Sequence, residues 1–458
     1  MTGRIAFQEI DAKRKEVEEL AHRLWEHPEV GYEEVNAAKW MAELLEQEGF
    51  QVEIGHAGVP TAVKAVWGIG KPVIGLLGEL DALPELSQKV SAVKDPVKLG
   101  APGHGCGHNL MCGSHVAAAL GIKKELEERK LSGTVVVYGC PAEERLTGKT
   151  FMARGGAFRE LDVAFSWHPH SMNYMISGCQ TAMVSTKFHF KGLSAHAATD
   201  PWNGRSALDA AELMNVGAQF LREHVTSDVR IHYSFDQAGG APNIVPDRAS
   251  MWYFVRGLSR DTVADVHARL KRIANGAAMM TDTEVSEEFL GGCYETMQNP
   301  VLLELIHQIM EELPRPEWTL EELSFASKLN QQSPAYEKLL KNGAVQPGEE
   351  IRSAVQPIAC ENIFGSTDVG DVQHIVPGIT FFTTCTNAGA AFHDWQFCAC
   401  AGSSIGHKGM LHGAKIMAAA ALCLIEDPAL LARTKEAFDR SMHGKAYECP
   451  IPDEIPVG

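Results

Sequence analysis

The sequence has little of what a nucleic-acid or membrane-surface protein needs. Its 458 residues include 41 lysines and arginines against 58 acidic residues, so the formal net charge is −17. Because nucleic acids and anionic lipid surfaces attract a basic face, this balance argues against both as partners. The longest apolar run, around 416–425, is too short to cross a bilayer and is bounded by Lys415 and Glu426. We therefore predict a buried helix there.

The N-terminal segment also lacks the sequence pattern of a secretory leader. The residues Met1–Ile5 lead directly into a charged helical pattern without an apolar segment, so we expect no signal peptide and a cytoplasmic location. The 11 cysteines of such a chain are expected to remain thiols or to bind metal. Several lie in apolar surroundings and are interpreted first as small core residues: Cys112, Cys140, Cys385, Cys398 and Cys423.

What the chain does have is the composition of an ordinary globular protein, with 45% hydrophobic and 22% charged residues. Its length exceeds what one hydrophobic core usually supports, so we expect two domains. The first part alternates predicted helices (10–27, 33–48 and 115–130) with predicted strands (62–67, 73–77, 134–139 and 163–166), and a loop covers 86–103. This alternation indicates an α/β fold whose functional site lies at the carboxyl edge of the sheet.

The pattern changes from about Met183. Strands are predicted at 183–190, 230–236, 249–256 and 284–289, with helices at 206–224 and 263–280. The order β-α-β-β-α-β is typical of a ferredoxin-like domain, which we interpret as an insertion into the first domain. The α/β pattern resumes near Pro300, the stretch 314–361 is irregular and polar, and a strand at 380–384 precedes a helix at 409–425.

Residue types that bind metals occur in four separated segments. Cys106 and His108 form a Cys-x-His pair within Gly103-His104-Gly105-Cys106-Gly107-His108, where the glycines let the backbone turn both side chains toward one point. Glu143 and Glu144 follow a predicted buried strand, His168 follows the next, and His393 lies in a late loop. Thiolate, imidazole and carboxylate together suit zinc or a similar divalent ion.

Each of these signals has a plainer interpretation. A buried Cys near a His is often structural, and an acidic pair is favourable at a solvated helix N-terminus. Two carboxylates beside a buried strand, however, favour a nearby cation that helps both stay ionised. A nucleophilic Cys106 with His108 as its base is disfavoured, because residues two apart in a glycine loop are poorly placed and the other positions stay unexplained.

These residues together resemble the aminoacylase, carboxypeptidase-G and auxin-conjugate-hydrolase family of metal-dependent amidohydrolases, and most closely its p-aminobenzoyl-glutamate branch. The resemblance extends through nearly the whole chain. It is carried by these motifs: Gly78-Glu-Leu-Asp-Ala-Leu-Pro84, His104-Gly-Cys-Gly-His-Asn109, Cys140-Pro-Ala-Glu-Glu144, Trp167-His-Pro169, Ser194-Ala-His-Ala-Ala198, Gly204-Arg-Ser-Ala-Leu-Asp209, Pro242-Asn-Ile-Val-Pro246, Ser366-Thr-Asp-Val-Gly-Asp371 and Ile405-Gly-His-Lys-Gly-Met410.

The resemblance implies a role for particular residues at the metal site. The positions that match the metal ligands are Cys106, His108, Glu144, His168 and His393. They imply a divalent metal cofactor, Zn or Mn, with one or two ions per subunit. Glu143 matches the general base, which takes a proton from the activated water and passes it to the leaving amine. Asp81 and Asp368 are expected behind the ligands.

The resemblance also implies residues that act from the inserted domain. His196 matches a histidine that reaches the active site of a partner subunit and stabilises the oxyanion. Asn243 and Arg256 match residues that grip the carboxylate of the substrate, a task suited to the planar fork of arginine. Without the resemblance, His196 is a surface histidine and Arg256 only a charge that ends a strand.

Two positions depart from the wider family. The His-x-Asp ligand motif of the carboxypeptidase branch is replaced by Glu79-Leu80-Asp81, which leaves the role of Glu79 open. Asn109 stands where the auxin branch has Asp. The sequence therefore leaves open whether one or two ions bind, and whether Cys106 bridges them.

The resemblance implies a zinc-peptidase-like α/β catalytic domain (1–182 and 298–458) with an inserted ferredoxin-like lid and dimerisation domain (183–297), which would form a homodimer or pair with a related subunit. The expected reaction is hydrolysis of the amide bond of an N-acyl amino acid, with p-aminobenzoyl-glutamate as the leading candidate. The alternatives are a dipeptidase or aminoacylase on the same scaffold, and a non-catalytic subunit of a heteromeric enzyme. The presence of Glu143 and of all five ligand positions argues against the last.

Overall fold

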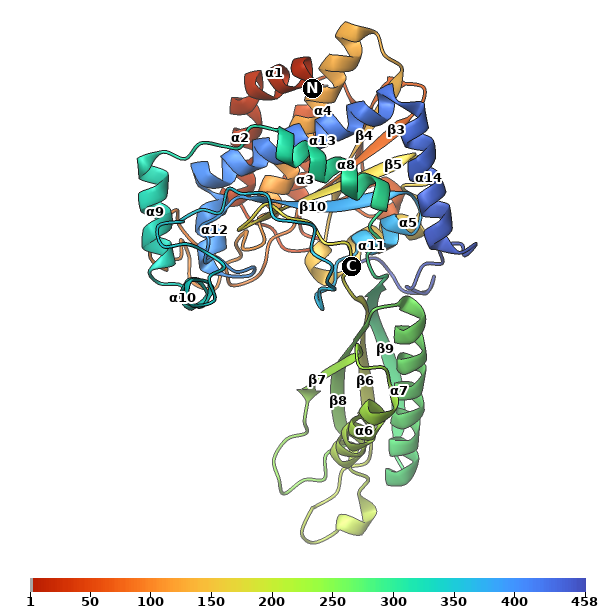
Figure 1. Ribbon diagram of the computed structural model, residues 1–458. Coiled ribbons are helices and arrows are strands. Elements are labelled where there is room, and N and C mark those ends of the chain that lie inside the picture. Colours follow the sequence, from red (N-terminus) through yellow and green to blue (C-terminus); the bar gives the residue numbers. More distant parts are fainter. Residues whose placement is uncertain (1–2) are drawn as a thin grey trace.

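The computed structural model describes residues 3–458 and builds them around two sheets (Figure 1). The sheet of the large domain has six strands in the order β1-β2-β4-β3-β5-β10, and that of the small domain has four in the order β7-β8-β6-β9. The strands of the large domain are β1 (Gln51–Ile54), β2 (Val63–Ile69), β3 (Val73–Glu79), β4 (Gly133–Cys140), β5 (Val163–His170) and β10 (Gly378–Thr384).

Four neighbouring strands of the large sheet, β4, β3, β5 and β10, run parallel, while β1 and β2 are antiparallel at one edge. Buried on both faces, the parallel strands are apolar almost throughout, as the sequence Val-Val-Val-Tyr within β4 illustrates. Their carboxyl ends meet at one edge of the sheet, at Glu79, Cys140, His170 and Thr384.

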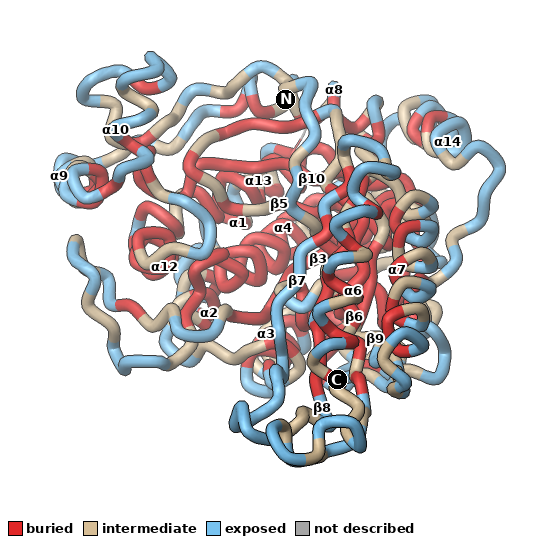
Figure 2. Tube along the Cα trace, turned by 90° about the horizontal axis from the view of Figure 1, so that it is seen from below, coloured by how far each residue is buried: buried red, intermediate tan, exposed pale blue. Residues whose placement is uncertain are grey.

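Helices cover both faces of the large sheet. They are α1 (Arg4–Ala12), α2 (Arg14–Glu26), α3 (Val35–Gln47), α4 (His108–Arg129), α5 (Gly148–Arg154), α8 (Pro300–Glu312), α9 (Leu320–Asn330), α10 (Pro334–Lys341), α11 (Val369–Gln373), α12 (Trp395–Ala401), α13 (Ser404–Glu426) and α14 (Pro428–Met442). Figure 2 shows α4 and α13 buried in the core, while α9 and α10 lie outside it. Although α13 is long and apolar enough to cross a membrane, 78% of its apolar window is buried, which confirms the predicted buried helix.

The small domain extends away from the large one and is antiparallel (Figure 1). Its strands are β6 (Ala182–Lys191), β7 (Arg230–Gln237), β8 (Arg248–Gly257) and β9 (Glu284–Cys293), and its long helices are α6 (Ala207–Leu221) and α7 (Arg260–Thr281). Alternate residues of β8, such as Met251 and Tyr253, pack under these helices in a hydrophobic cluster separate from that of the large domain. This confirms the ferredoxin-like order, and none of the helices in residues 3–458 covers the other face of the sheet.

Several predicted boundaries were wrong. The helix expected at 10–27 is divided at Lys13 into α1 and α2, and the helix expected from residue 115 begins at His108. The strand expected at 163–166 continues to His170, so His168 lies within β5. The stretch 314–361 contains α9 and α10, whose N-caps Thr319 and Ser333 accept backbone hydrogen bonds. The prediction also missed β1, α12 and α14.

Candidate metal centre

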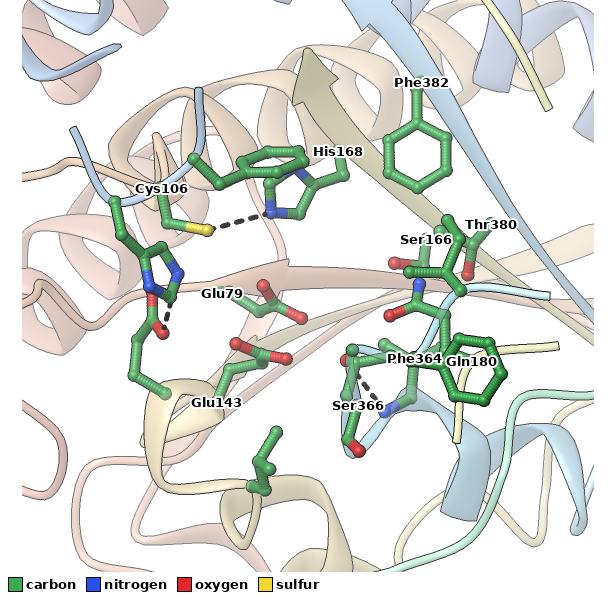
Figure 3. A pocket seen from close by; sticks show the side chains of 18 of the residues that line it. Glu79, Cys106, Glu143, Ser166, His168, Gln180, Phe364, Ser366, Thr380 and Phe382 are labelled. Atoms are coloured by element: carbon green, nitrogen blue, oxygen red, sulfur yellow. Dashed lines mark hydrogen bonds and ion pairs between the residues drawn. The ribbon is translucent and has the colours of Figure 1, made fainter. Parts of the chain in front are cut away.

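The predicted ligands come from segments that meet at the carboxyl edge of the large sheet. Glu79 ends β3, Glu143 and Glu144 begin the short 3-10 helix η2 (Glu143–Arg145) after β4, and His168 lies on β5. Cys106 and His108 approach from the start of α4. In Figure 3 the side chains of Glu79, Cys106, Glu143 and His168 turn toward a common space.

The turn that carries Cys106 and His108 requires glycine at its centre. Gly107 has φ 79°, in the left-handed region, and serves as the N-cap of α4. A Cβ at this position would meet Pro169 Cγ at 2.7 Å and Phe397 Cε1 at 2.9 Å. Only glycine satisfies both constraints without strain, which explains how a Cys-x-His pair turns its two side chains into one cluster.

The acidic pair is held by two other carboxylates. Ala142 and Leu146, on either side of η2, both have positive φ, which is uncommon for residues other than glycine. The backbone N–H of Ala142 donates to Glu34 Oε1 at 2.7 Å, and that of Glu144 donates to Asp81 Oδ2 at 2.9 Å. These two hydrogen bonds stabilise a strained backbone turn, which directs the side chains of Glu143 and Glu144 toward the site.

The ligand atoms form overlapping groups within metal-binding reach. Cys106 Sγ lies 3.3 Å from His168 Nε2, His108 Nε2 lies 3.1 Å from Glu79 Oε2, and His393 Nε2 lies 3.4 Å from Glu144 Oε2. Three sets have all their ligand atoms within 4.8 Å of one another: Cys106, His108 and His168; Cys106, Glu144 and His393; Glu79, His108 and Glu143. Cys106 and His108 each belong to two sets.

Three buried polar atoms of the cluster make no hydrogen bond. Among the residues described, Glu79 Oε2, His108 Nε2 and Glu144 Oε1 are buried without a hydrogen bond. Each such atom costs roughly 1–3 kcal/mol unless another group satisfies it. Three of them in one cluster of sulfur, nitrogen and oxygen donors fit a divalent ion of the zinc type.

Asp81 lies behind His108. The ring atom Nδ1 of His108 is 3.0 Å from both the carbonyl oxygen and Oδ1 of Asp81, which directs Nε2 into the cluster. Because Asp81 also accepts the backbone N–H of Glu144, one carboxylate orients two candidate ligands.

A buried lysine joins Glu79 to Asp368. The Nζ atom of Lys149, on α5, lies 2.6 Å from Glu79 Oε1 and 2.7 Å from Asp368 Oδ1, and all three side chains are almost fully buried. The backbone N–H of Lys149 also donates to Asp368 Oδ2 at 2.7 Å. Lys149 therefore occupies one oxygen of Glu79 and leaves the other toward His108. Lys149 was not predicted from the sequence, where its only signal is a charge among small and apolar neighbours.

The electrostatics of the cluster call for a cation. Burial, reinforced by Glu79 and Glu144, raises the pKa of Glu143 well above its ordinary value. Burial, against the attraction of His108 and with the repulsion of Asp81, raises the pKa of Glu144 to about 7. Burial also tends to raise the pKa of Glu79. The positive charges of Lys149 and His108 outweigh this effect and hold the pKa of that carboxyl below its usual value. A divalent ion would stabilise the ionised form of all three.

The cluster opens into a cavity of about 610 Å³ between the two domains. Aromatic rings from both domains line it: Tyr174, Phe254, Phe364, Phe382 and Phe392. Cys106 and Glu143 lie at one end, and Gln180, Phe364 and Ser366 lie at the other (Figure 3). Arg256 joins the lining from β8, and its Nη1 atom donates to Ser366 Oγ at 2.6 Å. Such a cavity suits a small molecule with an aromatic group and an anionic end.

Two predicted residues lie away from this cavity. His196 and Asn243 are exposed beyond the end of the small sheet that is remote from Arg256, separated from it by the 10 residues of β6. The backbone N–H of Ala197 donates to Asn243 O at 3.0 Å, and His196 Nδ1 accepts from the N–H groups of Ala198 and Thr199 at 3.2 Å. Within one chain, the structure brings Arg256 to the cavity but not His196 or Asn243.

The chain resembles known enzymes along most of its length. It is 38% identical to one of the subunits of p-aminobenzoyl-glutamate hydrolase from Escherichia coli, over 97% of this chain and 96% of that protein. It is 30% identical to the Xaa-Arg dipeptidase of Mus musculus over 95% of this chain and 91% of that protein. The crystal structure of the Bacillus subtilis YXEP protein, described as a dinuclear metal binding peptidase, has a TM-score of 0.60 at 19% identity, over 91% of this chain and 99% of that chain.

A family model also covers most of the chain and includes every segment of the cluster. It describes peptidase family M20/M25/M40 and matches residues 75–422. The chain therefore belongs to peptidase family M20/M25/M40 and is a metal-dependent amidohydrolase.

Proposed function

We propose that this enzyme hydrolyses the amide bond of an N-acyl amino acid, with p-aminobenzoyl-glutamate as the leading candidate. One observation carries the proposal: three unpartnered buried ligand atoms converge at the end of a cavity whose walls are aromatic. The 38% identical E. coli relative is named for p-aminobenzoyl-glutamate, which has an aromatic acyl group and an anionic amino acid.

We propose that the cluster holds one or two divalent ions, Zn or Mn. The proposed ligands are Cys106, His108, Glu144, His168 and His393. Because Cys106 belongs to two of the three groups of ligand atoms, it would be a ligand for an ion held by either group. Glu79, whose free oxygen faces His108, is a further candidate ligand that the sequence analysis left open.

The proposed mechanism assigns proton transfer to Glu143. A divalent ion bound here would supply Lewis-acid chemistry, bringing the pKa of a coordinated water down to about 7. Glu143 Oε2 lies 3.9 Å from His108 Nε2, close enough to the ligands to take the proton of an attacking water. Glu143 would then pass that proton to the leaving amine nitrogen, acting first as general base and then as general acid.

The other residues of the cavity bind and orient. Aromatic rings such as Phe382 and Phe392 would pack against the acyl group and exclude water. Arg256 would hold the carboxylate of the amino acid through its planar guanidinium fork.

We propose that the small domain, residues 183–297, acts as a lid and as a dimerisation surface, while 1–182 and 298–458 form the catalytic domain. Its separate hydrophobic cluster supports this division. The distance of His196 and Asn243 from their own cavity supports a role at the site of a second subunit, either an identical chain or a related one. Exposed apolar side chains such as Phe220 and Met280 suit such an interface. A cytoplasmic location remains a prediction.

The second candidate function is a dipeptidase on the same scaffold, favoured by the 30% identity to the Xaa-Arg dipeptidase. The amino acid released distinguishes the two functions. A non-catalytic subunit is the third possibility, and metal binding without hydrolysis of any N-acyl amino acid or dipeptide would support it.

The test is hydrolysis of p-aminobenzoyl-glutamate by the protein loaded with Zn²⁺ or Mn²⁺, beside the Glu143→Gln variant. We expect kcat to fall roughly 10²- to 10⁴-fold in the variant, with metal content unchanged, because the proton carrier is lost while the ligands remain. Glu33→Gln, which removes an exposed carboxylate, is the matched control and should keep full activity. Full activity of Glu143→Gln would contradict the mechanism.

A further inference from the structure

Two arginines lie opposite each other on neighbouring strands of the small sheet, at the end of the sheet that meets the cavity. Arg230 on β7 pairs in register with Arg256 on β8. Ile231 and Val255, the neighbours of these arginines in the strands, are buried under α6 and α7, so both arginines belong to the helix-free face. Like charges directly opposite one another destabilise an antiparallel pair unless something compensates them.

Nothing acidic in the described part of the chain pairs with either guanidinium. Arg256 is half-buried and donates to the hydroxyl of Ser366. Arg230 donates to the backbone carbonyls of Ser227 and Val229 at 2.7 and 3.1 Å, and its guanidinium stacks 4.6 Å from the ring centroid of Phe364. The nearby carboxylate of Asp228 accepts the backbone N–H of Leu258 instead.

The remote end of the same face is built differently. There Lys187 lies 3.0 Å from Asp236, and His189 lies 2.7 Å from Glu288, so both have acidic partners. Arg248, on the same face of β8, has no ion pair, but the residue that faces it, Lys191, lies 3.2 Å from Glu284. In the described part of the chain, two facing cations that both lack an ion pair therefore occur on this face only at the end that meets the cavity.

His232 and Phe364 connect this charge to the cavity. Both line it, and His232 follows Arg230 by two residues on the same face of β7. The carboxylates that line the cavity, Glu79, Glu143 and Glu144, all belong to the metal cluster at its other end. Burial, with Arg256 and neighbouring arginines, lowers the pKa of His232, so an anion beside these groups would relieve their mutual repulsion.

We propose that Arg230 and His232 form a subsite for a second carboxylate of the substrate, so that the amino acid released is dicarboxylic. This inference rests on the proposed function and names its substrate class. Arg256 alone accounts for one carboxylate, whereas Arg230 adds a second positive charge beside it and His232 adds a ring N–H that can donate a hydrogen bond. A substrate ending in arginine would place its guanidinium against these cations, so the same face disfavours the Xaa-Arg alternative.

The experiment compares p-aminobenzoyl derivatives of glutamate, glutamine and arginine on the metal-loaded enzyme. Glutamine has the shape of glutamate without the second charge. We expect kcat/KM to be about tenfold or more higher for glutamate than for glutamine, the range of a hydrogen bond to a charged group, and lowest for arginine. Arg230→Gln should lower kcat/KM about tenfold for the glutamate substrate only. Arg272→Gln, at an exposed position of α7 on the helix-covered face, is the control and should keep the preference.

The outcomes distinguish a failure of the second-carboxylate subsite from a failure of the proposed amidohydrolase function. If the wild type cleaves the glutamate and glutamine substrates equally, or if Arg230→Gln slows both alike, the second subsite is wrong and the amidohydrolase function stands. If no derivative is cleaved, the substrate proposal fails, and calorimetry with free glutamate and glutamine decides the subsite. Tighter binding of glutamate that Arg230→Gln abolishes would support it, and equal binding of the two would overturn it.

Discussion

The carboxyl edge of the large sheet and the open face of the small sheet handle charge in opposite ways. At the edge, the buried Glu79 and Glu143 and the half-buried Glu144 gather around His108, with Lys149 as the counter-charge of Glu79. On the open face, Arg230 is exposed and Arg256 is half-buried, and neither has a carboxylate partner in the described chain. The first region has an excess of acidic side chains, and the second has an excess of basic side chains.

The difference separates reaction from recognition. Buried carboxylates on strand ends are held rigidly, as a metal centre needs, and their cost is offset only if cations complete the site. Half-exposed arginines lose less hydration and remain free to meet an anion that arrives by diffusion. In the proposed mechanism, the large domain therefore accounts for bond cleavage and the small domain for the choice of substrate.

The largest effect is expected from removing the buried lysine that neutralises the carboxylates of the large domain. Lys149→Met should lower the free energy of unfolding by about 3–5 kcal/mol, because Glu79 and Asp368 would be left buried without their shared cation. Urea unfolding followed by circular dichroism measures this. Lys39→Met, which removes an exposed i,i+4 ion pair with Glu43, is the control. Equal small losses in the two variants would show that Lys149 is not the counter-charge of the site.

A smaller effect is expected from removing the metal. At an ion concentration of 100 times Kd, binding stabilises the fold by about 2.7 kcal/mol, so chelation should lower Tm and added Zn²⁺ or Mn²⁺ should restore it. Because every candidate metal group in the described chain lies in the large domain, amide hydrogen exchange should rise there and stay unchanged in α6 and α7. An equal rise in both domains would contradict the separation of the two regions.

The smallest effect concerns acid stability of the small domain. Burial tends to raise the pKa of Glu287, but hydrogen bonds from His267, Lys271 and Thr186 lower it to about 2. A depressed carboxyl contributes stability that is present above its unfolded pKa of 4.5 and is lost as the pH falls toward 2. Glu287→Gln should therefore flatten the acid unfolding curve over that window, measured by the fluorescence of Trp202 and Trp252. An unchanged curve would rule out this contribution.

The two regions also differ in how far the sequence predicted them. The ligand types at strand ends predicted the large-domain cluster, because thiol, imidazole and carboxylate groups recur in separate segments that an α/β fold brings to one edge of its sheet. The small domain was predicted as a fold from its alternating strands, yet Arg230 and His232 carried no local signal. Their role depends on the register of β7 against β8, which spacing along one strand does not contain.

Other misses have specific physical reasons. The start of α4 was placed seven residues late because its N-cap is Gly107, which offers no capping side chain, and because a Gly-rich turn precedes it. The helices α9 and α10 were missed because polar composition hid the caps Thr319 and Ser333. Lys149 was missed since a lysine after an acidic pair usually faces solvent, and only the fold shows that α5 packs it against β3 and α11.

Anomalous X-ray diffraction at the zinc or manganese absorption edge tests the central claim most directly. In crystals of the metal-loaded enzyme, we expect an ion within about 2.0–2.3 Å of Cys106 Sγ, His108 Nε2 or His168 Nε2, and a second peak, if present, beside Glu144 and His393. Anomalous density confined to surface residues, with none at the carboxyl edge of the large sheet, would contradict the account.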